Sequence, residues 1–301
     1  MNQTSNASYD PAFCDAQYNN RAMVPDHAAI FARWQHDSRD ARERLRASTG
    51  AQLDIAYGES PLEKLDFFPA KRIHLHTQPH RHPPLLIFIH GGYWRSLDKS
   101  DFSYIAPAFV EQGIAVAVLN YDLCPKVSIE TIVRQMLTAH TWLFMHAGQW
   151  GCDPHRMYTT GHSAGGHLAA MMLAARWPSW HGTLPPDLIK GAISVSGVHD
   201  LEPLLTTPFL SGDLRLTAAD IPRLSPAWMP PATHAPLVTA VGDLESDEFK
   251  RQTQLLAQRW KSVLHADVPL PGRNHFTSVD SLAEPGHALH RMALELIHLA
   301  E

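Results

Sequence analysis

A serine lies between two glycines in the stretch Gly-His-Ser-Ala-Gly, residues 161–165. A short apolar strand pattern (156–160) precedes this stretch, and a helix pattern rich in small residues (166–173) follows it. A sharp turn from strand to helix exposes the Oγ of a serine and points backbone N–H groups at a reacting oxygen. We therefore expect Ser163 to be the nucleophile of a hydrolase, with a helix-capping serine as the alternative.

A serine nucleophile needs a base that takes its proton and an acid that orients the base, and after a turn of this kind the chain order is Ser, acid, His. The sequence Gly-Arg-Asn-His-Phe lies between the last expected strand and the last expected helix, and its histidine, His275, is the expected base. His287, His290 and His298 fall on or at the start of that helix and fit the role less well. His162, next to the nucleophile, is expected to turn away and pack.

Three carboxylates compete for the role of the acid in the loop after the strand pattern 237–241. Glu245 comes three residues after Gly242, the position at which such an acid commonly falls. A glutamate can serve, because the task is to accept a hydrogen bond from the base and to stabilise its charged form. We expect Glu245 to be the acid, with Asp243 and Asp247 as alternatives.

The stretch His-Gly-Gly-Tyr-Trp, residues 90–94, follows the apolar strand pattern Leu85–Ile89. Glycines permit unusual backbone angles and let a substrate come close to the chain. We expect the backbone N–H groups of Gly92 and Tyr93, with that of Ala164 after the nucleophile, to form an oxyanion hole. A plain tight turn is the alternative interpretation of the two glycines.

Aromatic residues in or near these loops are candidates for contact with the substrate, although core packing is the default for an isolated aromatic residue. Five of them are expected to line the mouth of the site: Tyr93, Trp94, Phe209, Trp228 and Phe276.

The elements that must position these groups follow from the order of apolar patterns. From residue 84 onward, short strand patterns alternate with helix patterns, which predicts a mostly parallel sheet with helices on both faces. Right-handed crossovers then bring the loops that follow the strands to one edge of the sheet. Residues 1–50 carry a helical pattern expected to pack over the sheet edge or to border the site. Residues 200–236, long and rich in proline, predict a small lid within a single domain spanning 1–301.

The composition excludes several partners. The chain has 301 residues and a formal net charge of −5, so no basic field for nucleic acid or for an anionic membrane is expected. The longest dense apolar run is as short as a strand, and the first residues resemble no secretory signal. Three scattered cysteines fit a reducing compartment. We expect a cytoplasmic protein whose partner is a small-molecule substrate, and we leave a homodimer open.

Twenty histidines raise the question of a metal site. His74, His76, His80 and His82 gather in one polar segment flanked by prolines, but no zinc-motif spacing occurs in the chain. We prefer a solvated hairpin or loop there, and we expect neither a metal nor an organic cofactor.

Two motifs, His-Gly-Gly-Tyr-Trp at 90–94 and Gly-His-Ser-Ala-Gly-Gly-His at 161–167, resemble those of the α/β-hydrolase kynurenine formamidases (arylformamidases), near the hormone-sensitive-lipase-like esterases. The likeness runs from about Leu85 to the C-terminus. The segments Tyr18–Arg21 and Val24–Asp26 also look like those of bacterial formamidase-like proteins. The resemblance implies an α/β-hydrolase fold with a mostly parallel central sheet, helices on both faces and a small lid insertion.

By position, the resemblance implies Ser163 as nucleophile, Glu245 as acid and His275 as base. The implied reaction is hydrolysis of N-formyl-L-kynurenine to L-kynurenine and formate through a formyl-enzyme. The family acid is usually aspartate, which keeps Asp243 open, whereas esterase relatives carry a third glycine where Tyr93 stands, which favours the formamidase branch. The alternatives are a carboxylesterase or other small-acyl amidase with the same groups, and a ligand receptor of the same fold, which the complete set of groups argues against.

Overall fold

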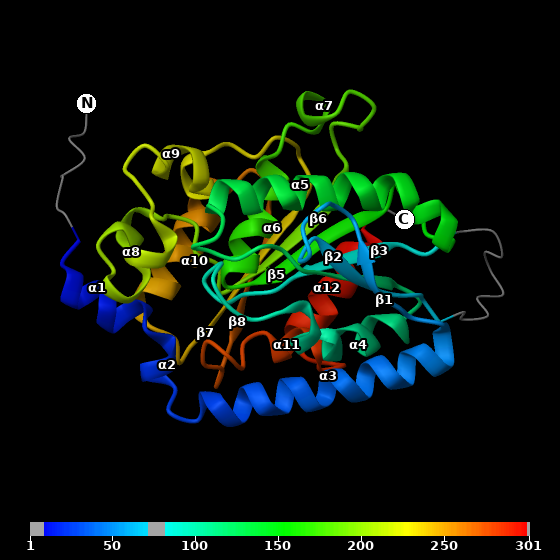
Figure 1. Cartoon of the computed structure of the whole chain (residues 1–301), viewed down its shortest axis with the longest axis horizontal. Coiled ribbons are helices and arrows are strands. Elements are labelled where there is room, and N and C mark those ends of the chain that lie inside the picture. Colours follow the sequence, from blue (N-terminus) through cyan, green and yellow to red (C-terminus); the bar gives the residue numbers. More distant parts are fainter. Residues whose placement is uncertain (1–8, 72–81, 300–301) are drawn as a thin grey trace.

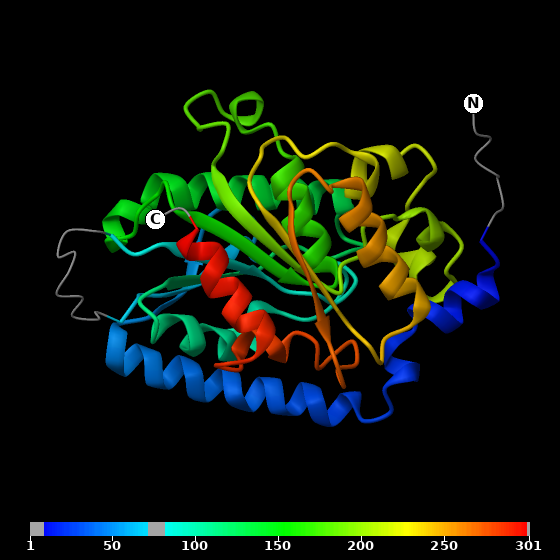
Figure 2. The ribbon, with the colours of Figure 1, turned by 180° about the vertical axis from the view of Figure 1, so that it is seen from behind.

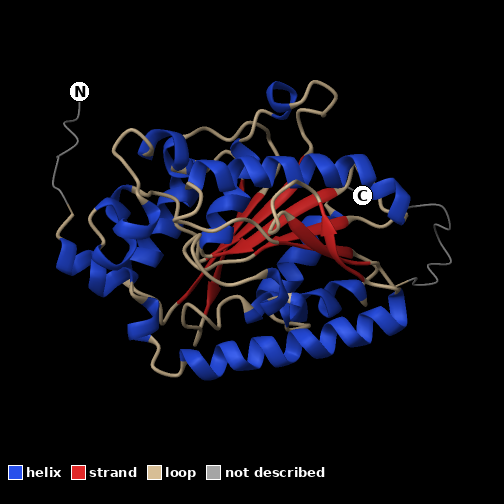
Figure 3. Ribbon diagram, viewed as in Figure 1, coloured by secondary structure: helices blue, strands red, loops and turns tan. Residues whose placement is uncertain are grey.

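The computed structural model describes residues 9–71 and 82–299, and in this part of the chain a single eight-stranded sheet forms the centre of the molecule (Figures 1 and 3). The strand order is β1-β2-β4-β3-β5-β6-β7-β8. β2 runs antiparallel to both of its neighbours, and every other pair is parallel. The strands are β1 (Gln52–Ala56), β2 (Lys64–Phe68), β3 (Leu85–Ile89), β4 (Ala115–Leu119), β5 (Met157–His162), β6 (Ile189–Val195), β7 (Leu237–Gly242) and β8 (Leu264–Leu270). The prediction of a mostly parallel sheet is confirmed.

The central strands are buried on both faces because helices cover both faces. In β3, Leu85 and Ile87 face one half of the core, and Leu86 and Phe88 face the other. Figures 1 and 2 show the two layers: one holds α5 (Ile129–His146) and α6 (Ala164–Ala174), and the other holds α3 (His27–Thr49), α4 (Ala106–Val110) and α12 (Ala288–His298). The α/β-hydrolase prediction therefore agrees with the observed layers.

The long helix α3 accounts for most of the helical pattern expected in residues 1–50. Its buried residues recur every three or four positions, from Ile30 and Trp34 to Leu45, so a single stripe packs against the sheet layer. The helix ends at Thr49, and the next residue, Gly50, has a φ of +76°, the left-handed conformation that glycine adopts readily. Before α3 lie two shorter helices, α1 (Pro11–Tyr18) and α2 (Asn20–Met23).

Residues 200–236 fold into short helices rather than an open loop. These are η4 (Glu202–Leu205), α8 (Pro208–Leu214), α9 (Ile221–Leu224) and η5 (Pro226–Trp228). Their buried residues, including Leu204 and Leu210, join the same half of the core as α5 and α6. α8 packs beside α1, as Figure 1 shows. The role of this segment as a lid and the single-domain assignment stay predictions.

The remaining helices are α7 (Trp177–Trp180), α10 (Asp247–Arg259), α11 (Asp280–Ala283), η1 (Lys99–Asp101), η2 (Ser103–Ile105) and η3 (Ala147–Trp150). None of the helices within residues 9–71 and 82–299 has the length and apolarity needed to cross a membrane. No group of side chains suited to a metal ion occurs among the described residues. Of the histidine segment, His74, His76 and His80 lie outside those residues, and His82 contacts the backbone oxygen of Gly151.

A buried ion pair fastens η1 to the antiparallel strand β2. The Lys99 ammonium lies 2.6 Å from Asp66 and 2.8 Å from Asp54, and the Asp66 side chain is fully buried. Burial alone would lower the pKa of Lys99, but the charges and hydrogen bonds of the two aspartates outweigh it and raise that pKa. The backbone N–H of Lys99 also donates to Asn120, so η1 is held beside the loop that follows β4.

We predict that Lys99→Met lowers the free energy of unfolding by about 3–5 kcal/mol, because it leaves the buried Asp66 carboxylate without a counter-charge. The matched control is Lys71→Met. Lys71 pairs with Glu111 at 2.6 Å, but both side chains are about half exposed, so a loss of at most about 1 kcal/mol is expected. Urea titration of both variants measures the difference, and equal small losses would contradict the prediction.

Candidate active site

Ser163 occupies the sharp turn between β5 and α6. Its φ of 57° and ψ of −118° lie outside the regions that residues other than glycine favour. The flanking glycines make this turn feasible: a Cβ on Gly161 would lie 2.2 Å from the oxygen of Gly165, and a Cβ on Gly165 would lie 2.0 Å from the oxygen of Ile89. The pattern of glycines around the serine therefore reflects the close approach of the two backbones.

The side chains of Ser163, His275 and Glu245 form one hydrogen-bonded relay. Ser163 Oγ lies 3.0 Å from Nε2 of His275, and Nδ1 of His275 lies 2.7 Å from Oε2 of Glu245. All three residues are buried, with at most 5% of their surface exposed. His275 comes from the loop after β8 and Glu245 from the loop after β7, the positions expected from the sequence. The arrangement can remove a proton from the serine and stabilise the resulting imidazolium.

Both partners of Ser163 in the relay are fixed by further hydrogen bonds. Oε1 of Glu245 accepts from the backbone N–H of Gly242 at 2.8 Å and from the hydroxyl of Ser196 at 2.5 Å. The backbone oxygen of His275 accepts from the hydroxyl of Ser278 at 2.9 Å. These contacts leave Oε2 of Glu245 directed at the imidazole.

The two alternative carboxylates are engaged elsewhere. Asp243 is exposed, and its Oδ1 accepts from the backbone N–H of Gly272 at 2.7 Å. The side chain of Asp247 is 95% exposed and faces Lys250. The structure therefore brings Glu245, and neither aspartate, to the imidazole.

His162 differs from the expectation that it would turn away from the site. It lines the same pocket as Ser163, and its Nε2–H donates to the backbone oxygen of His275 at 2.7 Å. Burial, followed by the proximity of the His275 ring, holds the pKa of His162 well below its usual value. The ring is therefore neutral at pH 7, and it positions the loop that carries His275.

The glycine loop after β3 bends back over the nucleophile. Gly92 has a φ of +106° and Tyr93 a φ of +51°, and a Cβ on Gly92 would lie 2.1 Å from the oxygen of Ser96. Among the described residues, no acceptor is found for the backbone N–H groups of Gly92 and Tyr93. Ala164 is the first residue of α6, so its N–H has no partner within the helix. In the described part of the chain these three donors have no acceptor, and they come from the two segments from which an oxyanion hole was expected.

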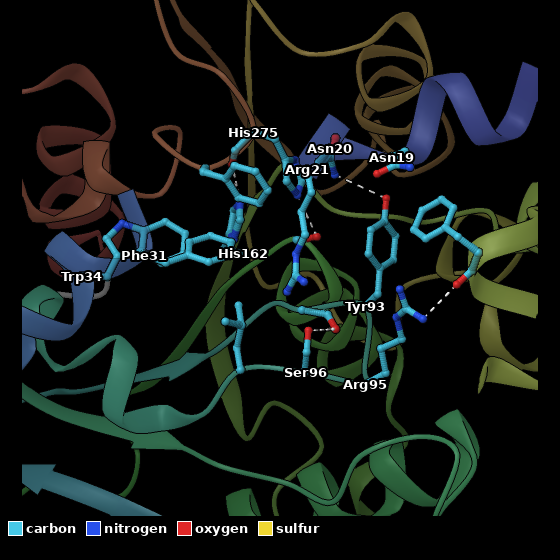
Figure 4. Close-up of a pocket in the computed structure, with 15 residues that line it drawn as sticks. Asn19, Asn20, Arg21, Phe31, Trp34, Tyr93, Arg95, Ser96, His162 and His275 are labelled. Atoms are coloured by element: carbon cyan, nitrogen blue, oxygen red, sulfur yellow. Dashed lines mark hydrogen bonds between the residues drawn. The ribbon is translucent and has the colours of Figure 1, made fainter. Parts of the chain in front are cut away.

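A pocket of about 100 Å³ opens beside Ser163 (Figure 4). Tyr93, Phe209 and Phe276 line it, in agreement with the expectation for these aromatic residues. The N-terminal segment contributes five more lining residues: Asn19, Asn20, Arg21, Phe31 and Trp34. Individually these five were not expected. The signals for them were the helical pattern of residues 1–50, which was expected to pack over the sheet edge or to border the site, and the resemblance of the segment Tyr18–Arg21 to formamidase-like proteins.

Two of the expected substrate contacts are wrong. Trp94 is fully buried in the core, where its ring meets that of His167 edge to face with centroids 5.0 Å apart. Trp228 lies outside the pocket as well: its Nε1–H donates to Asp200, and Arg259 covers its ring at 4.3 Å.

Comparison with known proteins identifies related sequences and structures. Residues 72–179 match the BD-FAE family model. The kynurenine formamidase of Salmo salar is 30% identical over 95% of this chain and 94% of its own length, and that of Danio rerio is 29% identical over 85% of each chain. A crystal structure of a provisionally assigned thioesterase from Silicibacter sp. TM1040 superposes with a TM-score of 0.77 at 31% identity, covering 91% of this chain and 96% of the other.

We predict that Glu245→Gln lowers kcat on the order of 10³- to 10⁴-fold, because the amide removes the charge and can donate to Nδ1 of His275, which favours the wrong tautomer. Asp243→Asn is the matched control. Its amide oxygen can still accept from Gly272, so a change of less than about threefold is expected. Both variants are compared by the hydrolysis of p-nitrophenyl acetate. A large loss in the Asp243 variant with a small loss in the Glu245 variant would reverse the assignment.

Proposed function

The chain belongs to the kynurenine formamidase family, and from that premise we propose that it hydrolyses an aryl formamide, N-formyl-L-kynurenine, to L-kynurenine and formate. The observation that carries this proposal is the aromatic wall next to the nucleophile. Phe31 lies 5.0 Å from Trp34 in a stacked arrangement and 4.9 Å from Phe276 in an edge-to-face arrangement, measured between ring centroids. An aryl leaving group can pack against such a wall, because aromatic rings pair in these same geometries.

In the proposed mechanism, Oγ of Ser163 attacks the formyl carbon while Nε2 of His275 takes the hydroxyl proton. The carbonyl oxygen becomes an oxyanion that the N–H groups of Gly92, Tyr93 and Ala164 stabilise. Glu245 stabilises the imidazolium through its hydrogen bond to Nδ1. The C–N bond then breaks, and His275 returns the proton to the departing aniline nitrogen.

The second half of the reaction uses the same groups. A formyl group remains on the oxygen of Ser163, and L-kynurenine leaves the pocket. His275 takes a proton from a water molecule, which attacks the formyl carbon and forms a second oxyanion. Collapse of this intermediate releases formate and returns the proton to Ser163.

A second candidate function is the hydrolysis of short carboxylic esters or other small acyl compounds by the same residues. The structural similarity to the provisionally assigned thioesterase from Silicibacter sp. TM1040 favours it, since that chain is 31% identical and covers nearly the same length. A formamide and an ester differ in the leaving group: the formamide, unlike the ester, requires the protonation of a poorly departing nitrogen.

We expect kcat/KM for N-formyl-L-kynurenine to exceed that for p-nitrophenyl acetate and p-nitrophenyl butyrate by at least about tenfold, because the leaving-group pocket contributes binding energy to the transition state. Steady-state kinetics on the purified protein measures this ratio. Ser163→Ala is the control for background hydrolysis and should abolish turnover of every substrate. Efficient ester hydrolysis with negligible release of kynurenine would favour the second candidate instead.

A further inference from the structure

Arg21 is a charged residue that the mechanism does not use. Its side chain extends from α2 into the pocket beside Ser163, as Figure 4 shows, and its guanidinium lies 5.6 Å from the centroid of the Phe31 ring. Among the described residues, no carboxylate lies within ion-pairing distance of Arg21, and no hydrogen-bond acceptor for its guanidinium is found there. A permanently charged group therefore lines the pocket next to the nucleophile without an anionic partner.

The other cation of the pocket is already neutralised. The guanidinium of Arg95 pairs with Asp213 and donates to the backbone oxygen of Phe209 at 2.8 Å. The residues that line the pocket include no aspartate or glutamate. Arg21 thus leaves the pocket with an excess of positive charge that an anionic part of a bound molecule would balance.

Arg21 is also attached to a well-anchored part of the chain. Tyr93 donates its phenolic proton to the backbone oxygen of Tyr18 at 2.6 Å, and the side-chain amide of Asn20 lies 3.4 Å from the same phenol oxygen. The hydroxyl of Tyr18 donates to Glu248 at 2.7 Å. The backbone that carries Arg21 is therefore tied both to the oxyanion loop and to α10, which fixes the point from which the exposed side chain reaches the pocket.

We propose that Arg21 binds the α-carboxylate of the substrate and so selects aryl formamides that carry an amino-acid side arm. The inference rests on the proposed function and names the part of the substrate that this residue recognises. Two parallel N–H donors of a guanidinium match the two oxygens of a carboxylate. With the aryl ring on the wall of Phe31 and Phe276 and the formyl group at Ser163, the side arm is the remaining part of the molecule, and Arg21 is the pocket's unpaired cation.

The test compares Arg21→Ala and Arg21→Lys on two formamides that differ in the side arm alone. N-Formyl-L-kynurenine carries the carboxylate, and 2-formamidoacetophenone keeps the aryl ketone and the formamide but has no amino-acid group. For Arg21→Ala we expect kcat/KM on N-formyl-L-kynurenine to fall about 30- to 100-fold, mainly through KM, and the loss on 2-formamidoacetophenone to be at least tenfold smaller. The kcat/KM of Arg21→Lys on N-formyl-L-kynurenine should lie between those of the wild type and Arg21→Ala, because lysine keeps the charge without the paired donors.

Arg39→Ala is the matched control for the loss of one positive charge, since Arg39 is exposed on α3 and does not line the pocket. It should leave kcat/KM on both formamides unchanged. Equal losses of kcat/KM on the two formamides in Arg21→Ala would indicate a structural role and overturn the inference. An unchanged kcat/KM on the carboxylate-bearing formamide would overturn it as well.

A binding experiment separates this inference from the proposed function. L-Kynurenine and 2-aminoacetophenone are tested as inhibitors of p-nitrophenyl acetate hydrolysis, which requires no formamidase activity. We expect Arg21→Ala to raise the inhibition constant of L-kynurenine at least tenfold more than that of 2-aminoacetophenone. If the wild type fails to hydrolyse N-formyl-L-kynurenine, the proposed function falls, and this inhibition ratio still decides the inference. Absence of inhibition by L-kynurenine, or equal changes for the two inhibitors, would overturn it.

Discussion

The backbone of β3 and the first turn of α6 approach so closely that no side chain fits between them. A Cβ on Gly165 would lie 2.0 Å from the oxygen of Ile89, and a Cβ on Gly91 would lie 2.8 Å from the oxygen of His162. β3 and β5 are hydrogen-bonded neighbours, with Ile89 opposite Gly161. The sheet therefore brings the loop after β3 next to the turn after β5. The glycine loop and the serine turn thus form one rigid unit, and the strained angles of Ser163 are held by sheet hydrogen bonds on either side.

The acid and the base reach this unit from the far edge of the sheet, and their positions depend on polar contacts rather than on close backbone packing. His162, at the end of β5, donates to the backbone of His275, and Gly242, at the end of β7, donates to Glu245. The end of β5 therefore supports the loop that follows β8, and the end of β7 supports the acid in the loop that follows it. These contacts leave a relay assembled from three loops little freedom to rearrange.

The sequence was most informative where the chemistry is local. The glycines around Ser163 and the turn at His275 mark sharp, short-range geometry, so the relay and the parallel part of the sheet could be predicted. The pocket could not, because its wall comes from α2 and α3, which are separated from the serine by more than a hundred residues. Trp94 shows the same limitation: its neighbour Tyr93 lines the pocket, but the indole of Trp94 is fully buried in the core, and no pattern in the sequence indicates that difference.

The N-terminal segment therefore does more than cover the sheet. The backbone of Tyr93 is part of the oxyanion loop, and its phenol is hydrogen-bonded to the N-terminal segment. Burial disfavours the phenolate and raises the pKa of this phenol well above its usual value. The phenol stays protonated at physiological pH and keeps its hydrogen bond to Tyr18. A glycine at this position could supply the same backbone N–H but could not hold α1 and α2 against the site. The tyrosine thus couples the geometry of the oxyanion loop to the wall of the pocket, so that the groups contacting the acyl oxygen and those surrounding the leaving group are positioned by one side chain.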